Sequence, residues 1–137
     1  MWRDVGADAQ LRAVPRNVLI GTVEPSGTFD ALLAGYGYDV DPDRSQLVET
    51  RFIEPHGFNG ARYSSADVDR WTEAALATYD RAERKRYYAL IQRRLNEDLP
   101  YVPIDWEQFV YAVNTDLRGF EPETVNSDFW NAQDWSI

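Results

Sequence analysis

Cysteine is absent from the 137 residues, and histidine occurs only once. Without thiols the chain forms no disulfide, no thiolate metal site and no cysteine nucleophile, and one imidazole cannot build the repeated histidine ligation common in zinc sites. Long apolar runs are also missing. No stretch of about 18 apolar residues occurs, so the sequence predicts no membrane span. No basic segment followed by an apolar one opens the chain, and we therefore expect no signal peptide within it.

Basic residues are scarce relative to acidic ones. Fourteen Lys and Arg face 23 Asp and Glu, which gives a net charge of −9 and a pI near 4.5. This balance argues against nucleic acid as a partner, because phosphate binding needs a basic surface. Hydrophobic residues make up 44% of the chain, with 8 Gly and 7 Pro, a composition typical of a folded domain rather than a disordered one. We expect one unit over 1–137 with no internal boundary.

The order of apolar segments favours an α/β fold with a mainly parallel sheet flanked by helices. Strands are predicted over Ala9–Val14 and Phe29–Gly35, with a helix starting at Pro15 between them. The second segment is almost continuously apolar, as expected for a strand covered on both faces. Crossover connections favour parallel pairing of two such strands. Further strands are predicted over 99–106 and 109–113, and a short helix over Ser45–Phe52.

A helical hairpin is the clearest local prediction. Apolar residues recur at helical spacing over Ser65–Tyr79 and over Arg81–Asn96, and Asp80 is placed to cap the second helix. The basic side chains of the second helix are interpreted as a solvated face with Glu83 and Glu97 as partners. We expect the two helices to dock through five side chains: Val68, Leu76, Tyr88, Ile91 and Leu95.

Three aspartates alternate in the loop that follows the second predicted strand. Asp39, Asp41 and Asp43 could suggest a calcium loop, but no Gly stands at the sixth position and no Glu at the twelfth. These acids are therefore interpreted as solvated or as supplying a single ligand-facing carboxylate. Gly-x-Ser-x-Gly and phosphate-cradling Gly-rich motifs are also absent, so the sequence predicts no metal and no cofactor.

Several segments, taken in order, carry a family resemblance. The first is Gly35-Tyr36-Gly37-Tyr38-Asp39-Val40-Asp41-Pro42-Asp43, and the second is Asn59-Gly60-Ala61-Arg62-Tyr63-Ser64. A Glu-Arg-x-x-x-Tyr helix at 83–88, the Glu-Asp-x-Pro-x-x-Pro stretch at 97–103, Gly119-Phe120 and the 130–135 tail complete the set. The chain resembles the extracellular solute-binding proteins of the oligopeptide and dipeptide ABC transporter family, solute-binding protein family 5. It departs from the family pattern at Tyr36, where Trp is usual, and at Tyr38.

This resemblance implies a lobe of type II periplasmic-binding-protein-like fold, with the 137 residues similar to the C-terminal portion of a two-lobed protein. It implies a binding protein rather than an enzyme. Asp39 would hold the α-ammonium group of a bound peptide, beside Tyr36, Gly37 and Tyr38. The implied partners are a peptide or other small solute, the membrane permease of an ABC importer and the rest of the parent polypeptide. The implied location is periplasmic or extracellular, with lipid anchoring through the N-terminal part of that parent.

The residues also leave two other classes of function open. One is a hydrolase acting on sugars or peptides through two of the clustered carboxylates, because the spatial separation of acids cannot be read from sequence. The other is a freestanding interaction module derived from a binding-protein lobe. A hydrolase would turn over its substrate, and replacing one acid would abolish the rate while binding persists. An interaction module would be a stable fold that binds a protein partner and has no cleft.

Overall fold

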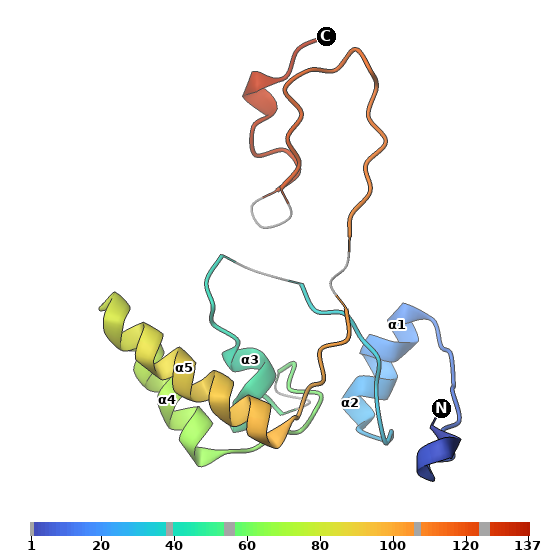
Figure 1. Ribbon diagram of the computed structural model, residues 1–137, viewed down its shortest axis with the longest axis vertical. Helices are drawn as coiled ribbons and strands as arrows, with labels where there is room; N and C mark the ends of the chain where they lie inside the picture. The colour runs from blue at the N-terminus through green and yellow to red at the C-terminus, as the bar shows by residue number, and fades with distance from the viewer. Residues whose placement is uncertain (1, 38–39, 54–56, 106–107, 124–126) are drawn as a thin grey trace.

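The computed structural model describes residues 2–37, 40–53, 57–105, 108–123 and 127–137, and in these ranges the regular structure is helical (Figure 1). None of the helices in these ranges is long and apolar enough to cross a membrane. The elements in chain order are η1 (Arg3–Val5), α1 (Arg16–Val18), η2 (Leu19–Val23), α2 (Glu24–Ser26), α3 (Ser45–Val48), η3 (Thr50–Phe52), α4 (Ala66–Leu76), α5 (Arg81–Asp98) and η4 (Ala132–Asp134).

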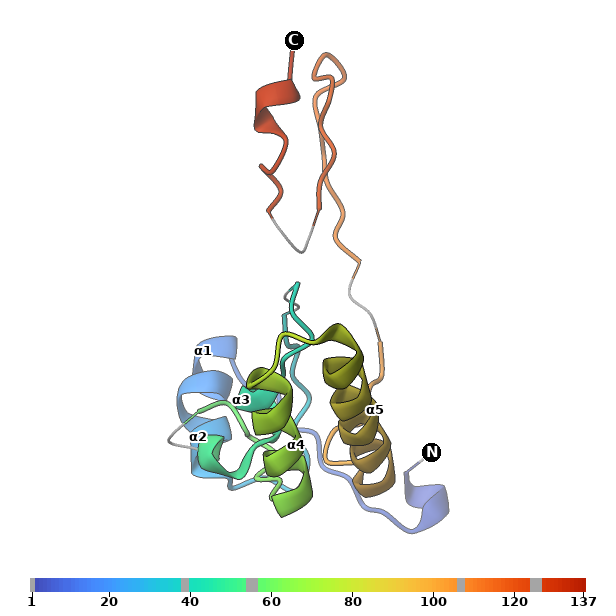
Figure 2. The same ribbon diagram turned by 90° about the vertical axis from the view of Figure 1, so that its left-hand side faces the viewer.

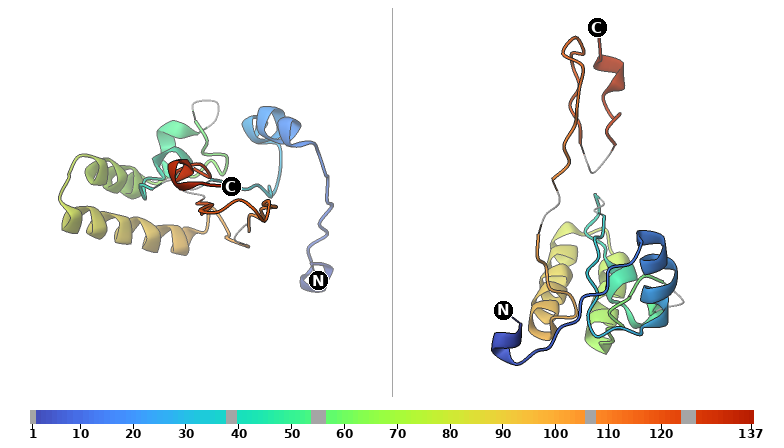
Figure 3. Two further views of the ribbon diagram at one scale, coloured as in Figure 1. Left: turned by 90° about the horizontal axis from the view of Figure 1, so that it is seen from above. Right: turned by 90° about the vertical axis from the view of Figure 1, so that its right-hand side faces the viewer.

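The helices α4 and α5 form the predicted hairpin and lie side by side (Figures 1 and 3). The Asp80 side chain accepts a hydrogen bond from the Glu83 amide at 2.8 Å, which confirms the predicted cap of α5. Val68 of α4, Ile91 of α5 and Val48 of α3 form the buried core. We call α3, η3, the loop 57–65, α4 and α5 the helical body.

The hairpin prediction was wrong in two details. Leu76 does not dock in the core: it lies in the last turn of α4 and is 45% exposed. The basic residues of α5 are exposed as predicted at Arg81, Lys85, Arg86 and Arg93, whereas Arg84 and Arg94 are half-buried. Arg84 pairs with Asp41 and Arg94 with Asp98, in place of the predicted partners Glu83 and Glu97.

A buried asparagine fixes the loop that leads into α4. Asn59 is fully buried, and its Nδ2 donates to the carbonyl oxygens of Glu49 and Tyr63 at 3.0 and 2.8 Å. Its Oδ1 accepts the Tyr63 amide at 3.1 Å. The Tyr63 hydroxyl in turn donates to Asp98 at the end of α5, at 2.6 Å. Two of the sequence segments that carry the family resemblance are therefore joined by direct contacts.

The predicted parallel sheet is not formed. Residues 9–14 and 29–35 have no ladder partner, and pairing in the described ranges is limited to isolated bridges, Ile53 with Asn59 and Arg118 with Ser136. A parallel pair needs a crossover helix lying over both strands. Here the connecting helix over 16–26 packs elsewhere: Glu24 is buried against Gly60, where a Cβ would lie 2.5 Å from the Glu24 Oε1. The flanking segments are thus not brought edge to edge, and the α/β prediction is wrong.

The strands predicted over 99–106 and 109–113 are also not formed in the described residues. Pro100 and Pro103 remove two of the amide donors that a ladder would use. Tyr101 instead anchors this segment to the helical body, because its hydroxyl donates to the Leu47 carbonyl at 2.8 Å.

Residues 108–123 and 127–137, which we call the C-terminal extension, stand away from the helical body along the long axis of the molecule (Figure 2). Phe120 packs edge-to-face on Tyr111 and Trp135, with ring centroids 5.7 and 5.3 Å apart. Asn131 is buried and donates to the Gly119 carbonyl at 2.6 Å. Gly119 has a φ of 77° and lies so close to Asp134 that a Cβ would meet its carbonyl oxygen at 2.5 Å, so this turn requires glycine.

Candidate functional site

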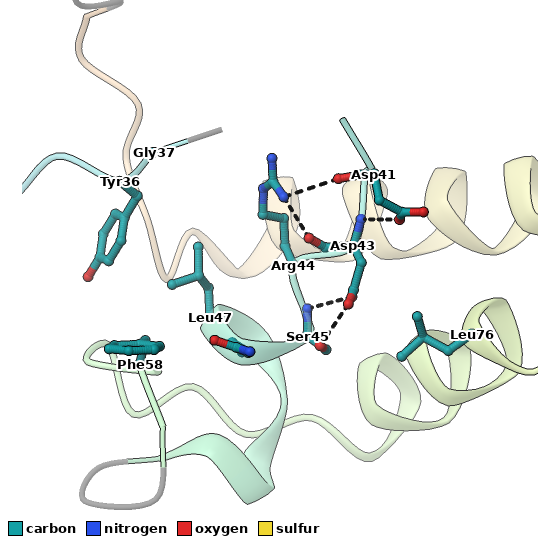
Figure 4. Close-up of a pocket in the computed structure, with 10 residues that line it drawn as sticks. Tyr36, Gly37, Asp41, Asp43, Arg44, Ser45, Leu47, Phe58 and Leu76 are labelled. Carbon is teal, nitrogen blue, oxygen red and sulfur yellow. Dashed lines mark hydrogen bonds between the residues drawn. The ribbon is translucent and has the colours of Figure 1, made fainter. Parts of the chain in front are cut away.

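A pocket of about 380 Å³ lies where the loop after residue 35 meets α3 and the end of α4 (Figure 4). Its volume is at the small end of the range for ligand sites, roughly 300–1,000 Å³. Its lining comes from three parts of the chain: the segment from Tyr36 to Leu47, the loop at Phe58 and the end of α4. The lining residues are Tyr36, Gly37, Asp41, Asp43, Arg44, Ser45, Gln46, Leu47, Phe58 and Leu76.

One side of the pocket is apolar. Tyr36, Leu47 and Phe58 gather there, and Phe58 is 55% exposed although it is a large hydrophobic side chain (Figure 4). Tyr36 is held from two directions: its hydroxyl donates to Glu24 at 2.8 Å, and its ring meets that of Tyr101 edge-on at 6.0 Å. A fixed aromatic ring is a suitable wall for an apolar group of a ligand, because it loses little conformational freedom on binding.

The other side of the pocket is polar and built by a chain of short loop contacts. Asp41 accepts the Asp43 amide at 2.9 Å, and Asp43 accepts the Ser45 amide at 2.9 Å and its hydroxyl at 3.2 Å. Arg44 donates to the carbonyl oxygens of Asp41 and Asp43 at 3.2 and 2.6 Å. Figure 4 shows these bonds closing the turn that enters α3. Two of the alternating aspartates are therefore used in building the loop.

Asp41 is joined to α5 by Arg84. The Nη2 of Arg84 lies 2.9 Å from both carboxylate oxygens of Asp41. The hydrogen bond from Arg84, together with that from the Asp43 amide, lowers the pKa of the Asp41 carboxyl below its ordinary value, so this group stays charged into moderately acidic solution. In the described ranges no group of three or more acidic or histidine side chains is placed to hold a metal ion.

Comparison with known proteins finds relatives among binding proteins. The chain is 23% identical over 134 residues to the oligopeptide-binding protein AppA of Bacillus subtilis, a match that covers 97% of this chain and 24% of the relative. It is 30% identical over 123 residues to the glutathione-binding protein GsiB of Escherichia coli, which covers 85% of this chain and 24% of that relative. GsiB of Shigella flexneri matches equally well.

The chain thus spans about a quarter of the length of the curated relatives it matches. No family model matches the chain, and no solved structure does. The names of both relatives describe binding of a peptide or of glutathione, not catalysis of a reaction. The similarity therefore agrees with the resemblance seen in the sequence at the level of a solute-binding protein.

The structure places some of the predicted site residues and not others. Tyr36 and Gly37 line the pocket. Asp39 and Tyr38 lie outside the described residues, so their role stays a prediction. The pocket also uses Leu76, which the sequence assigned to the hairpin core, and Phe58, which was not singled out.

Arg84 was missed as well, because its helix face was interpreted as solvated. A signal was present in the sequence: Tyr88 follows Arg84 by four residues, which on a helix brings the phenol next to the guanidinium and fixes it. An arginine fixed in this way is prepared to hold a distant carboxylate rather than to point freely into water.

Proposed function

We propose that the chain is the C-terminal part of an extracellular solute-binding protein that captures peptides or related small solutes for an ABC importer. The observation that carries this proposal is the similarity of nearly the whole chain to two proteins named for binding an oligopeptide and glutathione. On this proposal the protein works outside the cytoplasm, meets a membrane permease, and is completed by the rest of its parent polypeptide. Lipid anchoring would come from that parent.

The pocket offers what such a ligand needs. An apolar wall of Tyr36, Leu47 and Phe58 suits a ligand side chain, and it faces a wall that carries carboxylates. A carboxylate beside a poorly hydrated wall forms a strong charge-assisted hydrogen bond with an ammonium group. From the family resemblance we propose that Asp39 supplies such a carboxylate for the α-ammonium group of the ligand, and that Tyr36 supplies apolar contact to the ligand.

Isothermal titration calorimetry with trialanine, N-acetyl-trialanine and glutathione tests the proposal. Saturable binding without product is the expected result for the parent polypeptide that contains this chain, because the opposing lobe must close over the ligand, and the variants below are made in that parent. Asp39→Asn keeps the shape and removes the charge, and it should weaken binding of trialanine by about 2–5 kcal/mol, the usual effect of breaking a buried charge pair. The acetylated peptide, which has no ammonium group, should lose much less. Asp116→Asn, which removes an exposed acid of the C-terminal extension, is the matched control.

Two variants of Tyr36 distinguish the contribution of its ring from that of its hydroxyl. Tyr36→Phe keeps the ring and removes the hydroxyl that donates to Glu24, so affinity should change little. Tyr36→Ala should weaken binding of free and acetylated peptides alike. Equal loss of both peptides in Asp39→Asn would contradict the ammonium role. Release of cleaved peptide would contradict the proposed function in favour of a hydrolase.

A further inference from the structure

Arg84 makes an unusual contact for a residue on the outer part of a helix. Its partner Asp41 is 43 residues away in sequence, and one nitrogen, Nη2, bridges both carboxylate oxygens at 2.9 Å. The other ion pairs formed between described residues join positions no more than five apart. The Arg84–Asp41 pair therefore ties the loop 40–45 to α5, whereas the other pairs act within one turn or helix.

The Arg84 side chain is also held in place by Tyr88, independently of Asp41. Its Nη2 also donates to the Tyr88 hydroxyl at 3.2 Å, and its guanidinium carbon lies 5.5 Å from the centre of the Tyr88 ring. The side chain is only 27% exposed. Because these contacts restrict the rotamers of a long side chain, little further entropy is lost when the arginine grips the loop.

A chain of hydrogen bonds connects Arg84 to the pocket. Asp41 lines the pocket, and its Oδ1 also accepts the Asp43 amide, while Asp43 accepts the Ser45 amide at the start of α3. Arg84 itself is not among the lining residues. It sits behind the polar wall, fixes the position of that wall and offsets the charge of one of its two aspartates.

From this arrangement we infer that Arg84 is a positioning residue that sets which ligand charge the pocket accepts, an inference that rests on the proposed function. With Arg84 in place, the charge of Asp41 is offset by its partner and that of Asp43 by Arg44, so the wall carries no net charge and does not favour a cationic peptide over a neutral or anionic one. Without it, the wall carries one more uncompensated negative charge, which favours cationic peptides.

The test compares three peptides of equal length and different charge: glutathione, trialanine and trilysine. In Arg84→Gln we expect the ratio of trilysine affinity to glutathione affinity, measured by calorimetry, to rise about tenfold. Arg84→Lys keeps the charge at nearly the same reach and should restore most of the original ratio. Loss of fold alone would weaken all three peptides in parallel and would leave the ratio unchanged.

Arg94→Gln is the matched control, because Arg94 lies on the same helix and pairs with Asp98 at 2.8 Å without lining the pocket. It removes the same charge and should leave the affinity ratio unchanged. A ratio that stays constant in Arg84→Gln, or that rises equally in Arg94→Gln, would overturn the inference while leaving the proposed function intact.

A second measurement keeps the two proposals distinguishable. Exchange of the amide hydrogens of Asp43 and Ser45, which are bonded to the loop carboxylates, should speed up in Arg84→Gln and stay unchanged in Arg94→Gln, with or without a ligand. If the parent polypeptide that contains this chain binds none of the three peptides, the proposed function is contradicted, and the contact between α5 and the loop is then tested by hydrogen exchange alone. Unchanged exchange in Arg84→Gln would overturn it.

Discussion

The helical body and the C-terminal extension each enclose one asparagine, but only the body also has an apolar core. The body buries Val48, Val68 and Ile91 as well as Asn59, whereas Asn131 is the only buried residue in the described part of the extension. The extension is held together by edge-to-face contacts between aromatic rings and by hydrogen bonds from side chains to its own backbone. Apolar burial is the dominant favourable contribution to folding, so the body should account for most of the stability of the chain.

Removing part of the apolar core should produce the largest effect and tests this comparison directly. Ile91 is 6% exposed, and Ile91→Ala should lower the free energy of unfolding by about 2–5 kcal/mol, because the cavity left in a packed core relaxes only partly. Urea denaturation followed by far-UV circular dichroism measures this loss. Leu76→Ala on the more exposed end of α4 is the control and should lose much less. Equal losses would mean that the core has been misplaced.

The two asparagines sharpen the comparison. Asn59→Ala removes the bonds that Asn59 makes to the Tyr63 amide and the Tyr63 carbonyl, and it leaves the Glu49 carbonyl with its bond from the Phe52 amide. Each group left unsatisfied costs about 1–3 kcal/mol. The unfolding of the helices, followed by far-UV circular dichroism, should therefore have its midpoint at a lower urea concentration. Asn131→Ala should instead leave the helical transition in place and change the near-UV circular dichroism, since Trp135 loses the acceptor of its indole N–H.

Asn96→Ala, at an exposed position of α5, controls for the substitution itself and should be neutral or slightly stabilising because Ala favours helix. If Asn131→Ala shifted the helical transition as much as Asn59→Ala, the two regions would unfold as one unit, and the contrast drawn between them would be wrong.

Features that depend on contacts close in sequence could be predicted, and features that depend on distant contacts could not. The α4–α5 hairpin was predictable because a cap at Asp80 and a repeat of apolar residues act within a few turns. The sheet was predicted wrongly because an apolar run such as 29–35 indicates an extended segment and says nothing of whether a neighbouring strand is present to pair with it.

The candidate site divides in the same way. Tyr36 and Gly37 were predicted to be near a ligand from the loop that contains them, and both line the pocket, although their binding role stays a prediction. The Asp41–Arg84 tie was not predicted, because no local pattern connects residues 43 positions apart. Asn59 was noticed as part of a family motif, but only the structure gives its task of holding the Tyr63 backbone.

The smallest expected effect concerns pH and a second polar group that the body encloses. Glu49 is almost fully buried, its Oε2 pairs with Arg51, and its Oε1 has no hydrogen-bond partner within the described part of the chain. Burial raises the pKa of Glu49 above its ordinary value of 4.5, opposed by Arg51 and assisted by the nearby charges of Asp69 and Glu73.

A raised carboxyl pKa means that the folded state binds more protons than the unfolded state, so the body should lose stability as pH rises from 4.5 through the folded pKa of Glu49. The lowered pKa values of Asp41 and Asp98 also make stability fall at acidic pH, but they act alike in both proteins and cancel when Glu49→Gln is compared with the unaltered chain. Urea denaturation at about pH 4 and about pH 7 should therefore show Glu49→Gln gaining stability relative to the unaltered chain at the higher pH. Glu97→Gln, at an exposed position of α5, measures the general effect of one fewer acid. A difference between Glu49→Gln and the unaltered chain that is the same at both pH values would show that burial does not govern this carboxyl.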